Sequence, residues 1–578
     1  TATNVYNTAV GMNAGKAVTT AVQNTLIGGQ VGDALTQGAR NTAVGYVALS
    51  SDTLGQYSTA VGYAALFSSN QTTAVNTYNV AVGYAAGEAV TTGIRNTLIG
   101  GLAGDALTDA DYNVAMGLGA LGSDTLGSNN TAIGSFALGN QNFTTATASY
   151  NVAVGYDAGV SVTTGIRNTL LGSEAGDALT DADDNVAVGA LAFSGDTLGS
   201  RNTAVGRGAL KVQNFTTATE AYNTAVGYSS GESISTGASN TLIGGLAGDA
   251  ITTGASNVAV GVNSLGSNQA GSNSVAIGNG ALFTQVGSGN RFNIGIGADA
   301  GYAVTTGEQS TFVGSLAGDA ITTGNINVAL GYAALSTATI NSANVAIGGQ
   351  ALLNMNNTTT ANTFNTAVGY NAGVAVTTGV QNTLIGGQAG DNITTGGENT
   401  IVGYDIAANA VGAVRQVLIG SNFTAGGDNA VRIGTSVGLA TLALDGSDTS
   451  WAATSDERLK KDITDSTVGL SFINALRPVT FKWNAKNAIA DTLPQYDADS
   501  SDPVYGEGKA HHGFIAQEIK AVIDANSDVV DGHNIWAEDP DGTQQVAPSA
   551  LVPMLVKAIQ EQSALITALT DRIAALEG

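Results

Sequence analysis

About three quarters of the chain repeats one short pattern of polar and apolar positions. Its clearest copy is Asn151-Val152-Ala153-Val154-Gly155. Scored by the residue four places before its glycine, the pattern occurs 25 times, at positions 7, 24, 41, 58, 79, 96, 113, 130, 151, 168, 185, 202, 223, 240, 257, 274, 293, 310, 327, 344, 365, 382, 399, 416 and 430. The usual step is 17 residues and every fourth step is usually 21, which gives a superperiod of 72. A fixed period of this size indicates stacked structural repeats.

Each copy predicts one short β-strand. We number its polar residue, usually Asn, as position zero and its glycine as position four. Position three is almost always Val, Ile, Leu or Met, and position two is usually Ala, with Leu at Leu26, Leu98, Leu170, Leu242 and Leu384. Three such residues form a strand that Gly ends. Positions one and three then share a face. We expect one face to line a coil, and the small Ala on the other to admit a second copy of the chain.

A 17-residue step with short strands predicts a β-solenoid. The Asn residues would stack as a ladder between coils, and Gly would adopt the turn conformation that other residues resist. At ~4.8 Å per coil, the 25 coils predict a rod on the order of 120 Å long. Four-residue insertions map to loops on one face. They are either solvated bulges or a row of weak receptor contacts, and they lie at 68–73, 140–145, 212–217 and 354–359.

Two further recurrences have competing interpretations. Carboxylates in turns suit calcium, but each coil has few neighbouring acids, so turn formation is the better account of the Asp row. The Thr pairs recur once per superperiod rather than in every coil, which disfavours an ice-binding face. The Asp row is Asp33, Asp105, Asp177, Asp249, Asp319 and Asp391, and the Thr pairs are at 91–92, 163–164, 305–306 and 377–378.

The repeat resembles the head units of the trimeric adhesin YadA, which read N-S-V-A-I-G. Residues 273–278 match that unit letter for letter. The resemblance implies a left-handed parallel β-roll, three chains wide, over most of residues 1–434. The 17-residue step is longer than the usual unit of that family.

Composition and charge exclude several classes of function. The chain has no Cys, so disulfides and thiolate metal sites are excluded. The net charge is −25, divided as −16 before Ser455 and −9 from it onward, so nothing resembles a basic nucleic-acid surface. We expect no cofactor and no metal. No apolar run is long enough to span a membrane, and the N-terminus lacks a signal pattern and an initiator Met, as in a fragment or processed product.

The pattern of the chain changes after Gly434. We predict a solenoid shaft at 1–434, a polar connector at 435–454 and a mixed α+β domain at 455–578. Two of the three Trp and all three His lie beyond Ser455. Helices are expected near 472–476 and after 513, and a strand at 479–483.

The chain closes with a heptad seam that predicts a coiled coil at about 553–577. Steps of four and three residues join its members, which are Leu555, Ile559, Gln562, Ile566, Leu569, Ile573 and Leu576. Mostly Ile and Leu at both seam positions permits a trimer. The alternative is an amphipathic helix that packs on its own domain.

Residues 455–578 resemble the peptidase S74 intramolecular chaperone domain of phage tailspikes and tail fibres. The matching pieces are Ser455-Asp456-x-Arg458-x-Lys460 with Ile463, then Leu476-Arg477-Pro478-Val479-x-Phe481-x-Trp483, then His511-x-Gly513-Phe514-Ile515-Ala516-Gln517-Glu518. The resemblance implies a domain that trimerises, guides fibre folding and then cuts its own chain. It also implies that Ser455 attacks the Thr454–Ser455 bond with Lys460 as the base and His511 in support.

The residue types themselves suit this chemistry under one condition. A Ser hydroxyl needs a base, and Lys is a base only where burial or a nearby cation lowers its pKa. Assembly of three chains would supply that burial. The alternative is that Ser455 caps a helix whose N-terminus is favoured by Asp456 and Glu457.

These observations together predict a homotrimeric phage tail fibre that carries its own assembly chaperone. Its expected partners are a host cell-surface receptor or glycan and the virion tail proteins, with assembly in the host cytoplasm and an extracellular role on the virion. It would be a self-cleaving serine peptidase without an external substrate. The alternatives are a bacterial surface trimeric adhesin that uses the same chaperone, and a polysaccharide-depolymerising tailspike with paired acids between subunits.

Overall fold

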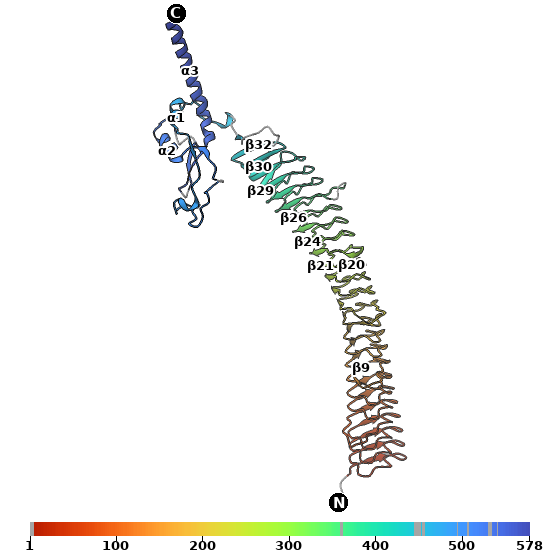
Figure 1. The fold of residues 1–578 in the computed structure, drawn as a ribbon. Helices are drawn as coiled ribbons and strands as arrows, with labels where there is room; N and C mark the ends of the chain where they lie inside the picture. Colours follow the sequence, from red (N-terminus) through yellow and green to blue (C-terminus); the bar gives the residue numbers. More distant parts are fainter. Residues whose placement is uncertain are drawn as a thin grey trace. The chain divides into compact units, whose positions relative to one another are not determined.

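The computed structural model describes residues 5–358, 362–443, 452–453, 457–493, 495–505, 508–529, 534–539 and 542–578. The chain separates into two compact units, Thr1–Thr454 and Ser455–Gly578. The first is a long stack of coils and the second is a small α+β unit that ends in a helix (Figure 1). The predicted fold class, a parallel β-solenoid followed by a small α+β region, is therefore confirmed.

Every copy of the repeat forms a strand at its positions one to three. Equivalent residues stack in register, as in the pairs Val152↔Thr169 and Val154↔Leu171. The repeat strands are β1 (Thr8–Val10), β2 (Thr25–Ile27), β3 (Thr42–Val44), β4 (Thr59–Val61), β5 (Val80–Val82), β6 (Thr97–Ile99), β7 (Val114–Met116), β9 (Thr131–Ile133), β11 (Val152–Val154), β12 (Thr169–Leu171), β13 (Val186–Val188), β15 (Thr203–Val205), β17 (Thr224–Val226), β18 (Thr241–Ile243), β19 (Val258–Val260), β21 (Val275–Ile277), β23 (Ile294–Ile296), β24 (Thr311–Val313), β25 (Val328–Leu330), β26 (Val345–Ile347), β27 (Thr366–Val368), β28 (Thr383–Ile385), β29 (Thr400–Ala407), β30 (Val417–Thr424) and β31 (Ala430–Thr435). Together they form one parallel sheet that runs the length of the shaft.

The shaft ends in antiparallel strands. β32 (Gly438–Ala443) pairs antiparallel with β31 and closes the parallel array, and β33 (Ala452–Ala453) pairs with β32. The predicted polar connector at 435–454 is described at 435–443 and 452–453, and these residues include β32 and β33. The left-handed sense and the three-chain width implied by the adhesin resemblance remain predictions.

The position-zero Asn residues form the predicted ladder, and they are buried. The Asn168 side chain donates from Nδ2 to the Ala182 carbonyl at 2.7 Å. Its Oδ1 accepts from the backbone N–H of Asn185 at 3.1 Å, while Asn168 N–H donates to Asn151 Oδ1 at 2.9 Å. Each Asn thus joins its own coil to the next one, and it satisfies polar groups that no water reaches.

Removing one Asn from this ladder should destabilise the shaft. Asn168→Ala leaves the buried N–H of Asn185 without its acceptor and the Ala182 carbonyl without its donor, so we expect a loss of about 2–4 kcal/mol in the free energy of unfolding. Urea denaturation measures this loss.

The chain itself provides a matched control for this prediction. At one natural position zero the residue is Ser310, whose Oγ accepts from the N–H of Asn327 at 3.1 Å. Asn168→Ser keeps an acceptor in this way and should cost clearly less than Asn168→Ala. Equal stability of the two variants would contradict the proposed role of the ladder.

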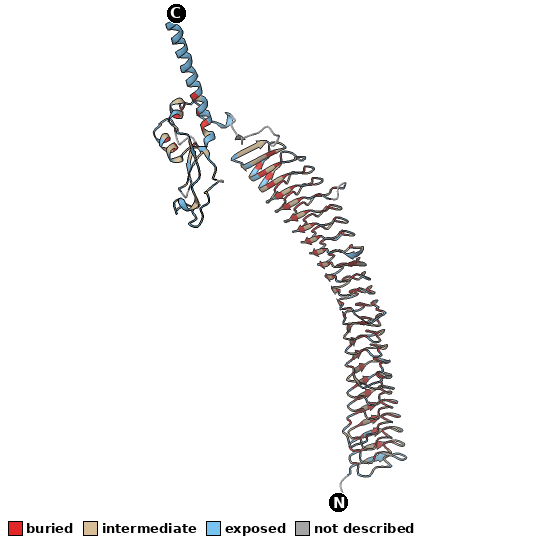
Figure 2. Ribbon diagram, viewed as in Figure 1, coloured by how far each residue is buried: buried red, intermediate tan, exposed pale blue. Residues whose placement is uncertain are grey.

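The coil interior is lined by position two, which corrects the expected orientation of the strands. Ala153 and Leu170 are fully buried, while Val152 and Val154 are only partly buried. Figure 2 shows buried residues along the whole stack of coils. The small Ala therefore faces its own narrow core rather than a second chain. Where position two is Leu, nearby residues are glycine: a Cβ on Gly159 or Gly176 would lie 2.5 or 2.8 Å from Leu170 atoms. Leu and Gly are complementary in volume, as close packing requires.

The four-residue insertions anchor themselves in the core. The Gln141 side chain is buried, donates to Asp124 Oδ2 at 2.6 Å and accepts from Asn151 Nδ2 at 2.8 Å. Phe143 is also buried, and its N–H donates to Asp124 Oδ1 at 3.1 Å. The neighbouring residues Asn140, Asn142 and 144–146 are exposed. The interpretation of these loops as simple solvated bulges is therefore wrong for residues 141 and 143.

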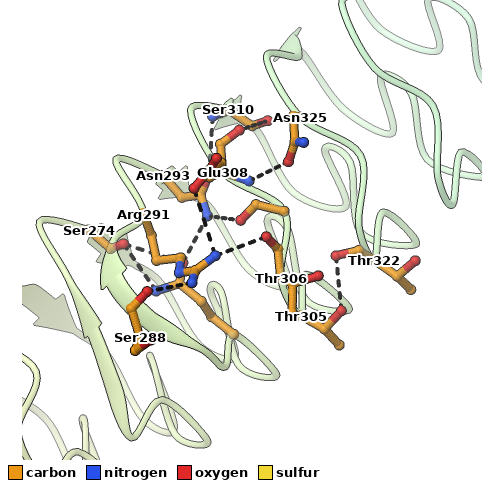
Figure 3. Close-up of polar contacts among 12 residues, drawn as sticks. Ser274, Ser288, Arg291, Asn293, Thr305, Thr306, Glu308, Ser310, Thr322 and Asn325 are labelled. Carbon is orange, nitrogen blue, oxygen red and sulfur yellow. Dashed lines mark hydrogen bonds and ion pairs between the residues drawn. The ribbon is translucent and has the colours of Figure 1, made fainter. Parts of the chain in front are cut away.

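The one shortened superperiod contains a short strand pair and an arginine that contacts neighbouring segments. Between positions 274 and 293, β22 (Ser288–Asn290) pairs with β20 (Ala270–Ser272). The Arg291 guanidinium donates to the carbonyls of Ser288 at 2.6 Å and Thr306 at 3.0 Å, and lies 3.8 Å from Glu308 (Figure 3). Comparable short pairs beside the longer insertions are β8 (Gly127–Ser128) with β10 (Thr147–Ala148) and β14 (Gly199–Ser200) with β16 (Thr219–Glu220).

The second unit contains three α-helices in its described part. They are α1 (Leu470–Ala475), α2 (Ala516–Asp524) and α3 (Val552–Glu577). Its strands are β34 (Val479–Phe481), β35 (His511–Gly513), β36 (Trp536–Glu538) and β37 (Gln544–Val546), with 3₁₀ turns at Glu457–Leu459, Lys486–Ala488 and Pro548–Leu551. A core that includes Phe472, Ile519, Ile535 and Met554 joins α1, α2 and the start of α3.

Candidate functional site

The second and third motif pieces of the C-terminal unit meet in one two-stranded sheet. β34 pairs antiparallel with β35, which places Phe481 opposite His511. Beside this sheet, the Arg477 guanidinium makes a bidentate ion pair with the Glu518 carboxylate. Arg477 lowers the pKa of Glu518 through this hydrogen-bonded contact. The two motifs, which lie far apart in sequence, thus form a single structural element.

His511 lies in an aromatic setting. Its ring is 5.7 Å from that of Phe481, which in turn contacts the Trp483 ring edge-on at 5.2 Å. The Nε2 atom of His511 is buried and has no hydrogen-bond partner among the described residues. The neighbouring His512 contacts Thr480 Oγ1 through Nδ1 at 3.2 Å.

The predicted catalytic pair is only half described. Thr454 and Ser455 lie outside the described residues. Lys460 is exposed and follows the 3₁₀ turn Glu457–Leu459, and its N–H donates to the Glu457 carbonyl at 3.0 Å. The distance between the Ser455 and Lys460 side chains, and the support from His511, therefore remain predictions.

Sequence reasoning missed two features near these motifs. One is a cavity of about 680 Å³, lined by residues that include Phe481, Trp483, Tyr505 and Phe514. In the sequence, the aromatic residues at the alternating positions 481 and 483 were the only indication of this cavity. The other is the contact of Glu561 on α3, whose Oε2 accepts from the Leu470 N–H at the start of α1 at 2.8 Å. This acceptor fixes α1 against α3.

The predicted heptad seam is exposed over most of α3. Only the first turns of the helix, through Met554 and Ala558, pack on the domain. The seam side chains of Ile559, Ile566 and Leu569 are 61–64% exposed. Figure 2 shows most of α3 coloured as exposed. The alternative, an amphipathic helix that packs on its own domain, therefore holds only for these first turns. An exposed apolar seam of this length is typical of a surface that contacts a partner.

Several of the Asp residues in the recurrent turns of the shaft have a raised pKa. Burial, together with the negative charges of Glu174 and Asp157, raises the pKa of Asp177 to about 6. Its Oδ1 is buried without a hydrogen-bond partner in the described part of the chain. Burial likewise raises the pKa of Asp105, Asp249, Asp319 and Asp391. Within the described ranges no three carboxylate or imidazole groups gather as metal ligands.

We expect the shaft to be more stable at pH 5 than at pH 7. The pKa of Asp177 is higher in the folded chain than in the unfolded one, so the folded chain holds more protons between those values and loses stability as pH rises through about 6. Thermal unfolding of wild type and Asp177→Asn at both pH values measures this. The substitution should flatten the pH dependence and raise the melting temperature at pH 7.

Asp184 provides the opposite case as a control. Arg167 lowers the pKa of Asp184 through a hydrogen bond, with Arg167 Nε 2.5 Å from Asp184 Oδ1. Asp184→Asn should therefore keep the gain in shaft stability that is expected when the pH is lowered from 7 to 5. Because the Arg167–Asp184 pair is exposed, the substitution should lower the stability at pH 7 only slightly. A pH profile of Asp177→Asn equal to that of wild type would contradict the assignment.

Comparison with known families adds one match to this geometry. Residues 455–528 match the family Peptidase_S74, described as chaperone of endosialidase. The match begins at the boundary between the two compact units and covers the motif sheet and α2. No curated protein and no solved structure matches the chain. No helix in the described ranges is long and apolar enough to cross a membrane.

Proposed function

We propose that residues 455–578 bring three copies of this chain together, direct the folding of the solenoid shaft and then cut the Thr454–Ser455 bond. The observation that carries the proposal is the Peptidase_S74 match, which starts at Ser455. The exposed seam of α3 supports it, because Ile and Leu at both seam positions suit a three-stranded coil.

The shaft would serve as a phage tail fibre that binds a host receptor or glycan outside the cell. Stacked coils contact only their neighbours, so such an array gives reach without a large core. Three near-identical rods have many alternative registers, and long-range parallel pairing is slow to form. A domain that aligns the chains first would remove that difficulty.

Expression of the whole chain tests this proposal. We expect ultracentrifugation to give the mass of three chains, and a denaturing gel to show two fragments divided at Thr454–Ser455. Deletion of residues 455–578 should give aggregated shaft. A single-chain mass for the intact protein, or soluble assembled shaft from the deletion, would overturn the proposal.

A further inference from the structure

The outer side of the solenoid sheet is unusual in its composition. We call the side chains at positions one and three of the 25 repeat strands, from Thr8 and Val10 to Val431 and Ile433, the strand face. Position one is Thr, Val or Ile in every strand, and position three is Val, Ile, Leu or Met. No acidic or basic residue occurs at either position, although the chain carries a net charge of −25.

The strand face is open to solvent in the single chain. Position-three residues such as Ile243, Leu330 and Ile385 are 39–41% exposed, and the other members are mostly half-buried. The charged and aromatic side chains of the shaft lie elsewhere, for example in the stacked pair of Tyr46 and Tyr63, two residues after the ends of their strands. The face is therefore a continuous stripe of β-branched and apolar groups.

The size of this stripe calls for a partner. Three residues at ~3.3 Å and 25 strands at ~4.8 Å give an area on the order of 1,200 Å². The largest apolar patch of a typical monomer is about 300–600 Å², and a standard stable interface buries about 800 Å² on each partner. A surface of this extent on each chain is sufficient for a stable complex.

The periodicity of the face identifies the partner. Its occupant has to be uncharged over the whole length of the shaft and has to present groups at the same ~4.8 Å repeat. The strand face of another copy of this chain meets both conditions. We propose that copies of this chain pack along their shafts through the strand face. The inference rests on the proposed function for assembly, and it names the surface that holds the shafts together after the C-terminal domain is released.

Charge placed on the strand face tests the inference. Ile243→Glu with Ile385→Glu puts carboxylates at two positions that are 40% and 39% exposed, so each single coil still folds. The matched control is Val212→Glu with Val411→Glu, at exposed positions outside the strands (51% and 58%). The readout is the mass of the cleaved shaft by ultracentrifugation.

Each outcome of this experiment has a defined meaning. Wild type and control should keep the multi-chain mass after cleavage, while the strand-face variant should fall to single shafts, roughly a threefold drop. An unchanged mass in the strand-face variant would overturn the inference. A wild-type shaft that assembles only while residues 455–578 are attached would also overturn it, yet leave the proposed function standing. An intact chain that never assembles would instead reject the proposed function.

A second measurement depends on neither cleavage nor a charge in the sheet. The chain has no Cys, so a cysteine introduced at one position is the only thiol that a maleimide reagent can link. With a short bismaleimide, Ile243→Cys should give a cross-linked two-chain band on a denaturing gel, and Val212→Cys should give almost none. Equal cross-linking at both positions, or none at Ile243→Cys in an assembled sample, would contradict packing through the strand face.

Discussion

Replacing Ser455 or Lys460 by Ala is expected to leave the chain uncut, with one band of 57.4 kDa where the wild type gives two fragments. A Ser hydroxyl attacks a peptide bond only when a base removes its proton, and in this proposal Lys460 is that base. Loss of either group removes the reaction rather than slowing it slightly. Denaturing gels and intact mass measure the result.

A neighbouring lysine provides the control for this experiment. Lys461 has a side chain that is 90% exposed, and its Nζ lies 3.9 Å from Asp462 Oδ2. Lys461→Ala should be cut as the wild type is. All three variants should still reach the three-chain mass, because assembly precedes cleavage in the proposal. Normal cutting of Lys460→Ala would reject the dyad.

The second large effect is expected from a glycine in the shaft. Gly244 ends β18 with φ of 137°, a backbone region that favours glycine, and a Cβ there would lie 2.6 Å from the carbonyl oxygen of Gly261 in the next coil. That carbonyl belongs to the backbone and cannot move aside without opening the stack. We expect Gly244→Ala to cost more than about 3 kcal/mol and to lower the shaft melting temperature sharply.

The adjacent residue separates this effect from a general loss of flexibility. Gly245 has nothing within 4 Å of the place where its Cβ would lie. Gly245→Ala should therefore be neutral or slightly stabilising, because Ala reduces the freedom of the unfolded chain. Circular dichroism melts of the two variants compare the effects directly. Similar destabilisation by both substitutions would show that the close contact of Gly244 with Gly261 is not the cause.

The repeat pattern predicted where the strands lie but not which way they face. A period of two says only that Val152 and Val154 share one side and that Ala153 takes the other. The interior side is decided by the space inside a coil, where Leu170 already meets Gly159 and Gly176. That complementarity joins residues from neighbouring coils, and it becomes visible only when the coils are stacked.

The insertions and the site show two further limits of sequence reasoning. The polar composition of the insertions predicted solvated bulges or receptor contacts, and it gave no sign of the buried link from Gln141 to Asp124. Motif order correctly marked the C-terminal unit, since residues 455–528 match the chaperone family. Spacing along the chain carries no information on side-chain separation, so the geometry of Ser455 and Lys460 stays a prediction.

The 72-residue superperiod makes the length of this protein modular. Positions 79 and 151 begin equivalent coils, with Asn79 and Asn151 in the same ladder and Gly83 and Gly155 in the same stack. Excision or duplication of one such block would join surfaces that already fit each other. It would change the length by four coils, on the order of 19 Å. Recombination between blocks would thus let a lineage adjust how far this protein extends without inventing a new junction.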